Sequence, residues 1–415
     1  MSTANAYSNR SGRWSEEGPS QDALTSKDQQ HWLTMADQLA ALLAESAVER
    51  DRQGGHAAME RELMRESGLL TLVVPTEYGG QGQPWSFVYR VIRRLARVDS
   101  ALAHVFAFHH LQVGSVILYG NRHQQQRLLT PTAHEHLFWG NALNPLDKRT
   151  TATECGDGGF ILQGKKGFCS GAKGSDYLTL SAWHEPTQSL VIAAVPTRRP
   201  GITVHDDWDA IGQRQTDSGT VSFEQVAIRE SEVLLPPGAA LSPAAQFRTC
   251  LAQLVLVNLY VGIAEGAFEE AKRYTLEQGR PWLASEAAQA QEDPYLQRHF
   301  GELWVTLRSA QALADIAGDI AQHHFVKRTA ISDEDRGATA VATAEAKVVA
   351  HQAALDASSR LFDIAGARAT ARPLGLDRFW RNARTHTLHD PVDYKIRDLG
   401  RWALLDQYPV PTSYS

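Results

Sequence analysis

The segment THTLHDPVDYK, residues 385–395, brings several proton-handling side chains together near the end of the sequence. His386 and His389 stand three residues apart, and Asp390 and Pro391 follow them directly. Residues at this spacing lie on adjacent turns of a helix, so a helical segment would turn both imidazoles toward one pocket. Imidazole donates a proton near neutral pH and takes it back later, and a neighbouring aspartate can orient the ring. The segment therefore predicts a site of proton transfer.

Two other interpretations of the histidine pair have to be weighed. Two histidines at this spacing can share a metal ion, but a metal site needs a third and usually a fourth ligand. The sequence has neither an HExxH motif nor a cysteine pair to supply them, so we predict no metal. A pair of structural histidines, satisfied by neighbouring groups, stays open when the residues are taken alone.

Polar side chains elsewhere in the sequence are further candidates. His104 lies in AHVFAFHH, an apolar stretch in which a histidine is more often a core residue with a hydrogen-bond partner. We interpret His109 and His110 as structural. Asn141 in WGNALNP and Ser170 in FCSGA offer amide and hydroxyl groups to a ligand, although both residue types also stabilise turns and strand ends.

Length and composition indicate an ordinary soluble protein of two or three domains. The 415 residues exceed what one compact core accommodates, and hydrophobic and charged residues make up 43% and 21%. A net charge of −6 gives no reason to expect nucleic acid as a partner. No uninterrupted apolar run approaches the roughly 18 residues that span a bilayer, so we expect no membrane association. Three widely spaced cysteines form no disulfide or zinc framework.

The order of expected elements divides the chain into parts. Residues 1–25 are polar, contain no apolar core typical of a secretory signal, and read as a disordered lead-in, so we expect a cytoplasmic protein. Helical periodicity over 26–54, 56–67, 85–98 and 100–119 predicts a helical domain at 26–137. Short β-rich runs predict a β domain of about 100 residues at 138–238. Long amphipathic helices over 247–276, 297–326, 339–364 and 377–401 predict a bundle at 239–404, followed by an apolar, aromatic tail at 405–415.

This order resembles the acyl-CoA dehydrogenase superfamily, and three stretches carry the resemblance. They are LLTLVVPTEYGGQG, YGNRHQQQRLL and GKKGFCSGAKGSDYL, in the family's order and spacing. The resemblance covers about residues 28–404. It implies a mainly α protein with an N-terminal helical domain, a middle β-barrel and a C-terminal four-helix bundle. It also implies a flavin between the β domain and the bundle, and a homotetramer.

The sequence departs from the dehydrogenases at their catalytic base. Those enzymes remove a proton with a glutamate, which lies either late in the chain or in the first helix of the bundle. The corresponding positions here hold His389, Asp390 and Pro391 in the first case, and Ala252 and Gln253 in the second. Asp390 can in principle act as a shorter base, so an FAD-dependent acyl-CoA dehydrogenase remains an alternative. A catalytically silent scaffold of the same fold is a third possibility.

The segment RNARTHTLHDPVDYK, with AHVFAFHH, GNALNP, FCSGA and GRPW, resembles the flavin-dependent monooxygenase branch, especially the organosulfur oxygenases related to dibenzothiophene monooxygenase. That resemblance implies a two-component enzyme that receives reduced FMN (FMNH2) from a separate NAD(P)H:flavin reductase. With O2 as co-substrate, a C4a-hydroperoxyflavin would oxygenate a thiophene, sulfide or sulfinate. N-hydroxylation of an amine uses the same chemistry and remains open. The absence of a GxGxxG run after a strand fits a separate reductase.

The same resemblance assigns roles to individual residues. His389 is the first choice for stabilising the peroxide, and the full catalytic set is His389, His104, His386, Ser170 and Asp390. The cofactor-binding set is Asn141, Phe168, Ser170, Trp208, Ser218, Arg280, Gly366 and Arg368. Arg280 is a candidate for the flavin phosphate because a guanidinium matches phosphate geometry. DIAGARAT keeps Gly366 but lacks the usual glycine pair, which favours FMN over FAD. Phe108, where some relatives carry tyrosine, would line the substrate pocket.

Overall fold

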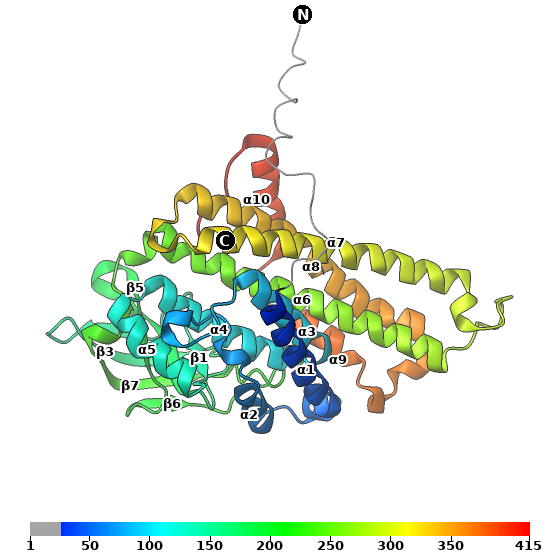
Figure 1. Ribbon diagram of the computed structural model, residues 1–415, viewed down its shortest axis with the longest axis horizontal. Coiled ribbons are helices and arrows are strands. Elements are labelled where there is room, and N and C mark those ends of the chain that lie inside the picture. Colours follow the sequence, from blue (N-terminus) through cyan, green and yellow to red (C-terminus); the bar gives the residue numbers. More distant parts are fainter. Residues whose placement is uncertain (1–25) are drawn as a thin grey trace, which may run out of the picture.

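The computed structural model describes residues 26–415, so the predicted lead-in at 1–25 lies outside the described residues (Figure 1). The described chain begins with helices α1 (Lys27–Gln53), α2 (Ala58–Glu66), α3 (Trp85–Val98), α4 (Ser100–Tyr119) and α5 (Arg122–His134). Side-chain caps define two of the predicted starts. Ser26 accepts a hydrogen bond from the backbone N–H of Gln29 at 3.1 Å, and Asp99 accepts one from Leu102 at 3.0 Å. Helices α1 and α4 therefore begin where the sequence predicts them.

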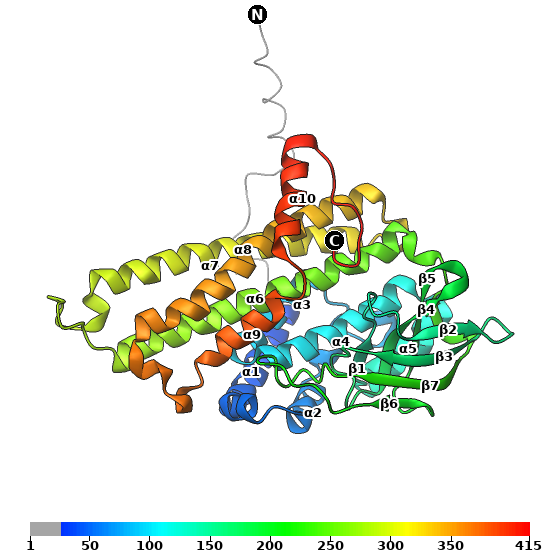
Figure 2. The same cartoon turned by 180° about the vertical axis from the view of Figure 1, so that it is seen from behind.

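An eight-stranded sheet follows the helices. Its strands are β1 (Trp139–Ala142), β2 (Thr151–Glu154), β3 (Phe160–Lys166), β4 (Tyr177–His184), β5 (Ser189–Pro196), β6 (Ile202–Val204), β7 (Val221–Ile228) and β8 (Val233–Leu235). The order across the sheet is β6-β7-β3-β2-β4-β5-β8, and β1 adds to β4 in parallel, with Trp139 opposite Tyr177. Helix α4 packs against β1, which brings the sheet next to the helical part (Figure 2).

The C-terminal bundle is built around its first helix. It consists of α6 (Pro243–Gln278), α7 (Pro294–Phe325), α8 (Asp333–Ala365), α9 (Asp377–Thr387) and α10 (Val392–Leu405). Helix α6 contacts α7, α8 and α9 within the bundle and α3 and α4 outside it. Gly262 and Gly266 allow the close approach to α3, because a Cβ atom at Gly262 would lie 2.7 Å from the backbone oxygen of Arg93.

The structure corrects the prediction of one helix over 377–401. Helix α9 ends at Thr387, and α10 begins only at Val392. Pro391 is the cause, since it lacks an N–H for helix bonding and disfavours the α conformation in the residue before it. His386 consequently lies in the last turn of α9, whereas His389 lies in the connecting turn, where its N–H donates to the carbonyl of His386 at 3.0 Å.

Two core helices are more apolar than the sequence interpretation allowed. By length and composition, α4 and α6 are both long and apolar enough to cross a membrane. In the fold, 94% of the apolar window of α4 and 89% of that of α6 are buried inside the protein. The count of uninterrupted apolar runs missed them because polar residues such as His104 and Asn258 interrupt each helix. Both helices are central core elements here.

The apolar, aromatic tail docks on its own chain and returns along α10 (Figure 2). Tyr408 stacks on Trp402 with ring centroids 4.6 Å apart and an interplanar angle of 13°. The buried Arg336 of α8 donates a hydrogen bond to the carbonyl of Pro409 at 2.6 Å. Gly337 lies directly under the Tyr408 ring, where a Cβ atom would come within 2.5 Å of it.

Candidate active site

Helices α4 and α9 bring two predicted histidines together in the interior. The imidazole of His104 on α4 lies 4.8 Å, between centroids, from that of His386 in the last turn of α9. Phe108, one turn after His104, stacks on the His104 ring at 4.0 Å with an interplanar angle of 23°. Tyr260 of α6 donates a hydrogen bond at 2.9 Å to the carbonyl of His386, which fixes the end of α9.

The two buried imidazoles have nitrogens without partners among residues 26–415. Both ring nitrogens of His104 and Nδ1 of His386 are buried and make no hydrogen bond there. Burial, with a smaller effect of His389, lowers the pKa of His104 from 6.5 to about 3, and burial also lowers the pKa of His386 well below 6.5. Both rings are therefore neutral near pH 7, and each offers one donor and one acceptor. Buried polar atoms left unpaired are costly, so this geometry suits a polar ligand.

His389 lies at the mouth of this cluster. Its side chain is 39% exposed, and its Nδ1 lies 2.9 Å from Oδ1 of Asp390. The ring of Tyr414, from the tail, meets the His389 ring edge-on, with centroids 5.1 Å apart. The tail therefore covers part of His389, the first choice of the sequence analysis for stabilising the peroxide.

Asp390 is held by a buried network that the sequence interpretation did not find. Lys347 of α8 donates to Oδ1 of Asp390 at 2.5 Å and also to Oε1 of Gln253. The side chains of Lys347 and Asp390 are only 1% and 4% exposed. Burial by itself raises the pKa of Asp390, but the hydrogen bond of His389 and the charge of Lys347 hold it below its usual value. Burial lowers the pKa of Lys347 to about 8.

A signal for Lys347 was present in the sequence. Within the alanine-rich stretch 339–364, the lysine stands four residues after Thr343 and three before Ala350, both of which are buried. It therefore occupies the apolar face of its helix, where a cation is rare unless it has a buried partner.

The sheet edge gathers the predicted flavin-facing residues. Ser170 and Ser218 share a hydrogen bond of 2.7 Å between their hydroxyls, and the backbone N–H of Asn141 donates to the carbonyl of Ser170 at 3.0 Å. Phe168, with a left-handed φ of 58°, is 66% exposed, and its ring meets that of Trp208 edge-on at 6.1 Å. The edge thus presents an exposed phenylalanine and a half-buried tryptophan beside buried hydroxyl and amide groups.

Two contacts bring this edge to the histidine cluster. Gly171 lies against Val105, the residue after His104, because a Cβ atom at Gly171 would be 3.4 Å from Cγ1 of Val105. The backbone N–H of Gln213 donates at 2.6 Å to Oδ1 of Asn382, which stands one turn before His386 on α9. The sheet, α4 and α9 therefore converge on one place.

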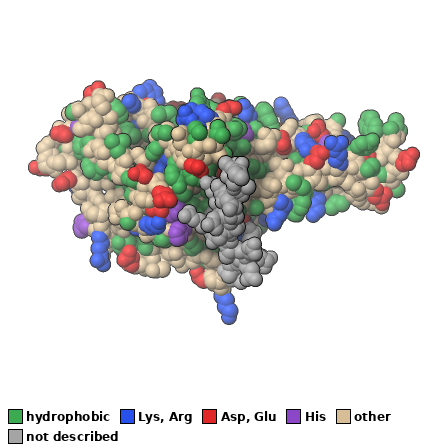
Figure 3. Space-filling model, turned by 90° about the horizontal axis from the view of Figure 1, so that it is seen from above, with side chains coloured by type: hydrophobic (Ala, Val, Ile, Leu, Met, Phe, Trp, Pro, Cys, Tyr) green, Lys and Arg blue, Asp and Glu red, His purple; other side chains and the backbone are tan. Residues whose placement is uncertain are grey.

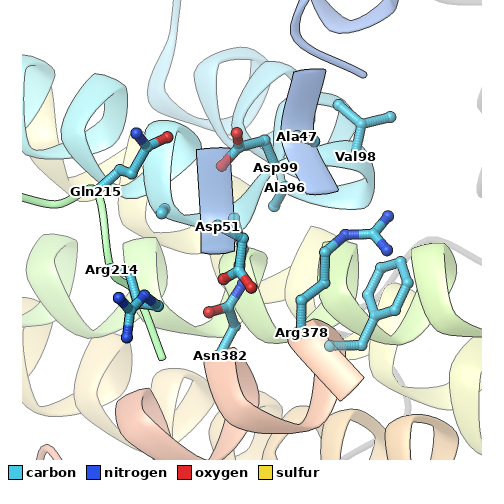
Figure 4. A pocket seen from close by; sticks show the side chains of 12 residues that line it. Ala47, Asp51, Ala96, Val98, Asp99, Arg214, Gln215, Arg378 and Asn382 are labelled. Carbon is cyan, nitrogen blue, oxygen red and sulfur yellow. The ribbon is translucent and has the colours of Figure 1, made fainter. Parts of the chain in front are cut away.

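The loop that carries these contacts is anchored to the helical part. Arg50 of α1 donates to Asp99 at 2.6 Å and to Gln215 at 2.7 Å, and it thereby ties the loop after Trp208 to the start of α4. Figure 4 shows the small polar cavity at this junction, with Asp99 and Gln215 on one side and Asn382 on the other. This anchoring fixes where the sheet edge meets the histidine cluster.

Three predicted cofactor residues lie elsewhere. Arg280 follows α6, whereas Gly366 and Arg368 follow α8, and all three are exposed. From Gln253, which touches Asp390, to the end of α6 at Gln278 the helix runs about 37 Å. Within one chain, Arg280 therefore lies far from the histidines, and the structure of the described residues gives Gly366 and Arg368 no contact with them.

Two other findings concern histidines and metals. His109 has a structural role, because its Nε2 lies 2.8 Å from the carbonyl of Leu70 and its Nδ1 accepts from the N–H of Trp139 at 3.1 Å.

Among residues 26–415 there is no group of three or more His, Cys, Asp or Glu side chains placed to hold a metal ion.

Comparison with protein-family models matches three domains in the same order as the fold. These are the acyl-CoA dehydrogenase N-terminal domain at residues 26–136, the middle domain at 142–226 and the C-terminal domain at 254–394. Helices around a central sheet, with aromatic, hydroxyl and amide groups at the sheet edge beside buried histidines, fit a flavoenzyme of this class. The chain belongs to the acyl-CoA dehydrogenase family.

Individual relatives place the chain within the family. A probable FMNH2-dependent monooxygenase, SfnC of Pseudomonas putida, is 50% identical over 384 residues, which cover 92% of this chain and 97% of the relative. Dibenzothiophene monooxygenase of Rhodococcus erythropolis is 44% identical over 393 residues, covering 91% and 94%. The structure of methanesulfinate monooxygenase MsuC from Pseudomonas fluorescens superposes with a TM-score of 0.90 at 50% identity, covering 92% and 99%. The chain is therefore a flavin-dependent monooxygenase.

Proposed function

We propose that this protein is a two-component, FMNH2-dependent monooxygenase that oxygenates an organosulfur compound. The cluster of His104 and His386, neutral and with free ring nitrogens, carries the proposal. A cluster of this kind binds polar oxygen atoms and moves protons without placing a charge in the pocket. Relatives at 44–50% identity are named for FMNH2 dependence, dibenzothiophene and methanesulfinate, which supports both the cofactor and the substrate class.

The residues at the sheet edge fit reduced FMN. Phe168 and Trp208 offer an aromatic surface for the ring system, and the hydroxyls of Ser170 and Ser218 with the amide of Asn141 offer hydrogen bonds. When bound, the reduced flavin supplies the electrons that activate O2. The protein's part is to exclude water, to position the substrate beside Phe108, and to exchange protons through His389 and the two buried imidazoles. The structure of FMN-bound TdsC from Paenibacillus, 39% identical with a TM-score of 0.89, supports this cofactor.

A second copy of the chain would supply the phosphate contacts. Because Arg280 and Arg368 lie at the exposed end of the bundle, they would meet the flavin of a neighbouring subunit in the homotetramer that we propose. Apolar side chains exposed on α7 support such packing, among them Trp304, Val305 and Ile316, which are 51%, 65% and 49% exposed. Figure 3 views the molecule from above Figure 1, where apolar side chains lie among charged ones. A cytoplasmic location and a separate flavin reductase complete the proposal.

The dehydrogenase alternative is disfavoured by the contacts of Asp390. Its Oδ1 already accepts hydrogen bonds from Lys347 and pairs with His389, and its pKa lies below the usual value. Such a carboxylate is a weak base. N-hydroxylation of an amine has one supporting observation: L-evernosamine nitrososynthase of Micromonospora is 29% identical over 69% of this chain. The higher identity of the sulfur oxygenases favours sulfur.

Isotope incorporation tests the proposal. The protein is supplied with FMN, NADH and a flavin reductase under 18O2, separately with methanesulfinate, with dibenzothiophene and with an amino sugar. We expect one 18O atom per oxygenation in the sulfur product, and none when the protein is omitted. Label in the amine alone would support N-hydroxylation instead. Bleaching of bound FAD by an acyl-CoA without oxygen, with no labelled product, would support a dehydrogenase.

A further inference from the structure

The Lys347–Asp390 pair sits in a place where an ion pair is a poor source of stability. Lys347 extends from the alanine-rich face of α8 toward α6, and its side chain is 1% exposed. Replacing such a pair by apolar residues is often neutral or stabilising, whereas removing one partner leaves a costly unpaired charge. Packing of α8 against α6 therefore does not explain why a buried ion pair stands at this position.

The hydrogen bonds of the network make the carboxylate of Asp390 a hydrogen-bond acceptor. Lys347 donates to Oδ1 of Asp390, and Gln253 places its Nε2 3.4 Å from the same oxygen. Nδ1 of His389 lies 2.9 Å from that oxygen as well. An ionised carboxylate can only accept, so Nδ1 of His389 must carry the hydrogen in this contact. The other ring nitrogen, Nε2, then has a free lone pair in the neutral imidazole.

We propose that Lys347 is a positioning residue that keeps Asp390 an acceptor and thereby holds His389 in the Nδ1–H form, with Nε2 as its proton-exchanging atom. Lys347 touches neither flavin nor substrate in this arrangement and acts only through Asp390. That Nε2 exchanges protons with flavin or substrate rests on the proposed function. The tautomer of His389 itself is a property of the protein alone and can be measured without either ligand. The other charged or titratable side chains that interact with the pair are His351, Lys395, Tyr260, Tyr414 and His386, and His104 lies against His386.

Two variants separate this role from a purely structural one. In Lys347→Met, the buried carboxyl loses its cation and takes up a proton, so it donates to Nδ1 and forces the Nε2–H form of His389. In Asp390→Leu, no acceptor remains beside Nδ1 of His389, and the neutral imidazole is then free to take the Nε2–H form. The second variant is nearly isosteric, so it decides the question even where the first fails to fold.

The tautomer is measured by 15N NMR of the full-length protein labelled at histidine. The resonances of His389 are identified by their loss in His389→Gln among the 16 histidines. Arg199→Met is the matched control, because it breaks a largely buried ion pair with Glu232 in the β domain, away from the histidines. We expect Nδ1–H in the parent protein and the control, and Nε2–H in both test variants. Retention of Nδ1–H in folded Asp390→Leu would overturn the proposal.

A second readout follows oxygen use. We expect product formed per NADH consumed to fall at least about tenfold in Lys347→Met and Asp390→Leu, and to be unchanged in Arg199→Met. If the parent protein oxygenates no sulfur compound, the proposed function fails while the NMR result still decides the role of Lys347. If the tautomer changes but the coupling does not, Lys347 positions His389 without consequence for the reaction, and the functional half of the inference is refuted.

Discussion

Replacing His104 by phenylalanine should make the protein less sensitive to acid. The folded protein keeps His104 neutral, because burial lowers its pKa from 6.5 to about 3. The unfolded chain binds a proton at this residue as the pH falls below 6.5, whereas the folded chain does not until about pH 3. Folding stability is therefore lost as the pH falls, at about 1.4 kcal/mol per pH unit within this window. Between pH 7 and pH 5 the loss from His104 amounts to about 2 kcal/mol.

Urea unfolding at pH 7 and at pH 5, at one protein concentration, measures this difference. A phenylalanine at position 104 keeps an aromatic ring against Phe108 and removes the titrating group. We expect the decrease in unfolding free energy from pH 7 to pH 5 to be about 2 kcal/mol smaller in His104→Phe than in the parent. Contributions from other buried histidines, such as His109, occur in both proteins and cancel in the comparison.

The matched control is His123→Phe, at an exposed position on α5. Its pH dependence should follow that of the parent protein. Equal losses of stability in the parent and in His104→Phe would show that the imidazole of His104 reaches water or a hydrogen-bond partner. The description of a neutral, ligand-ready histidine cluster would then be wrong.

Three further predictions concern other parts of the site. His389→Ala should still bind FMN but release reduced-flavin electrons as hydrogen peroxide, so an unchanged product yield per flavin would contradict its role. Arg280→Ala should weaken FMN binding, measured by fluorescence titration, more than riboflavin binding, and equal losses would remove the phosphate contact. Gly337→Ala places a Cβ atom 2.5 Å from the Tyr408 ring and should expose the tail to proteolysis, whereas Gly301→Ala, with open space around it, should not.

The helices were predictable wherever local chemistry decides their ends. Asp99 and Ser26 are polar caps directly before apolar periodic segments, and the structure begins α4 and α1 after them. Pro391 signals the break after α9, but the prediction of one helix over 377–401 did not take it into account. Helix α5 was indicated only through resemblance, because its polar sequence RHQQQR has little periodicity of its own.

The site was predictable in part. Resemblance indicated His104 and His386, and the structure places their rings 4.8 Å apart although 281 positions separate them along the chain. Periodicity cannot supply such a distance, since it describes one helix at a time. The sequence also could not show that α6 runs about 27 Å from Tyr260, which contacts His386, to its end just before Arg280; this distance follows from helix length rather than from residue type.

The contacts of Lys347 explain why the catalytic glutamates of the dehydrogenases are absent here. The two places where the resemblance looks for a catalytic glutamate hold Ala252 and Gln253 in one case and Asp390 with its neighbours in the other, and the side chains of Gln253 and Asp390 both bind the same buried ammonium group. A glutamate acting as base needs a free carboxylate oxygen facing the substrate, whereas here the accepting oxygen is committed to Lys347 and His389. The proton-exchanging group is thereby moved from a carboxylate to an imidazole, which both donates and accepts. Proton removal from carbon needs only a base, but oxygen transfer needs a proton to be given and then taken back, and His389 suits that requirement.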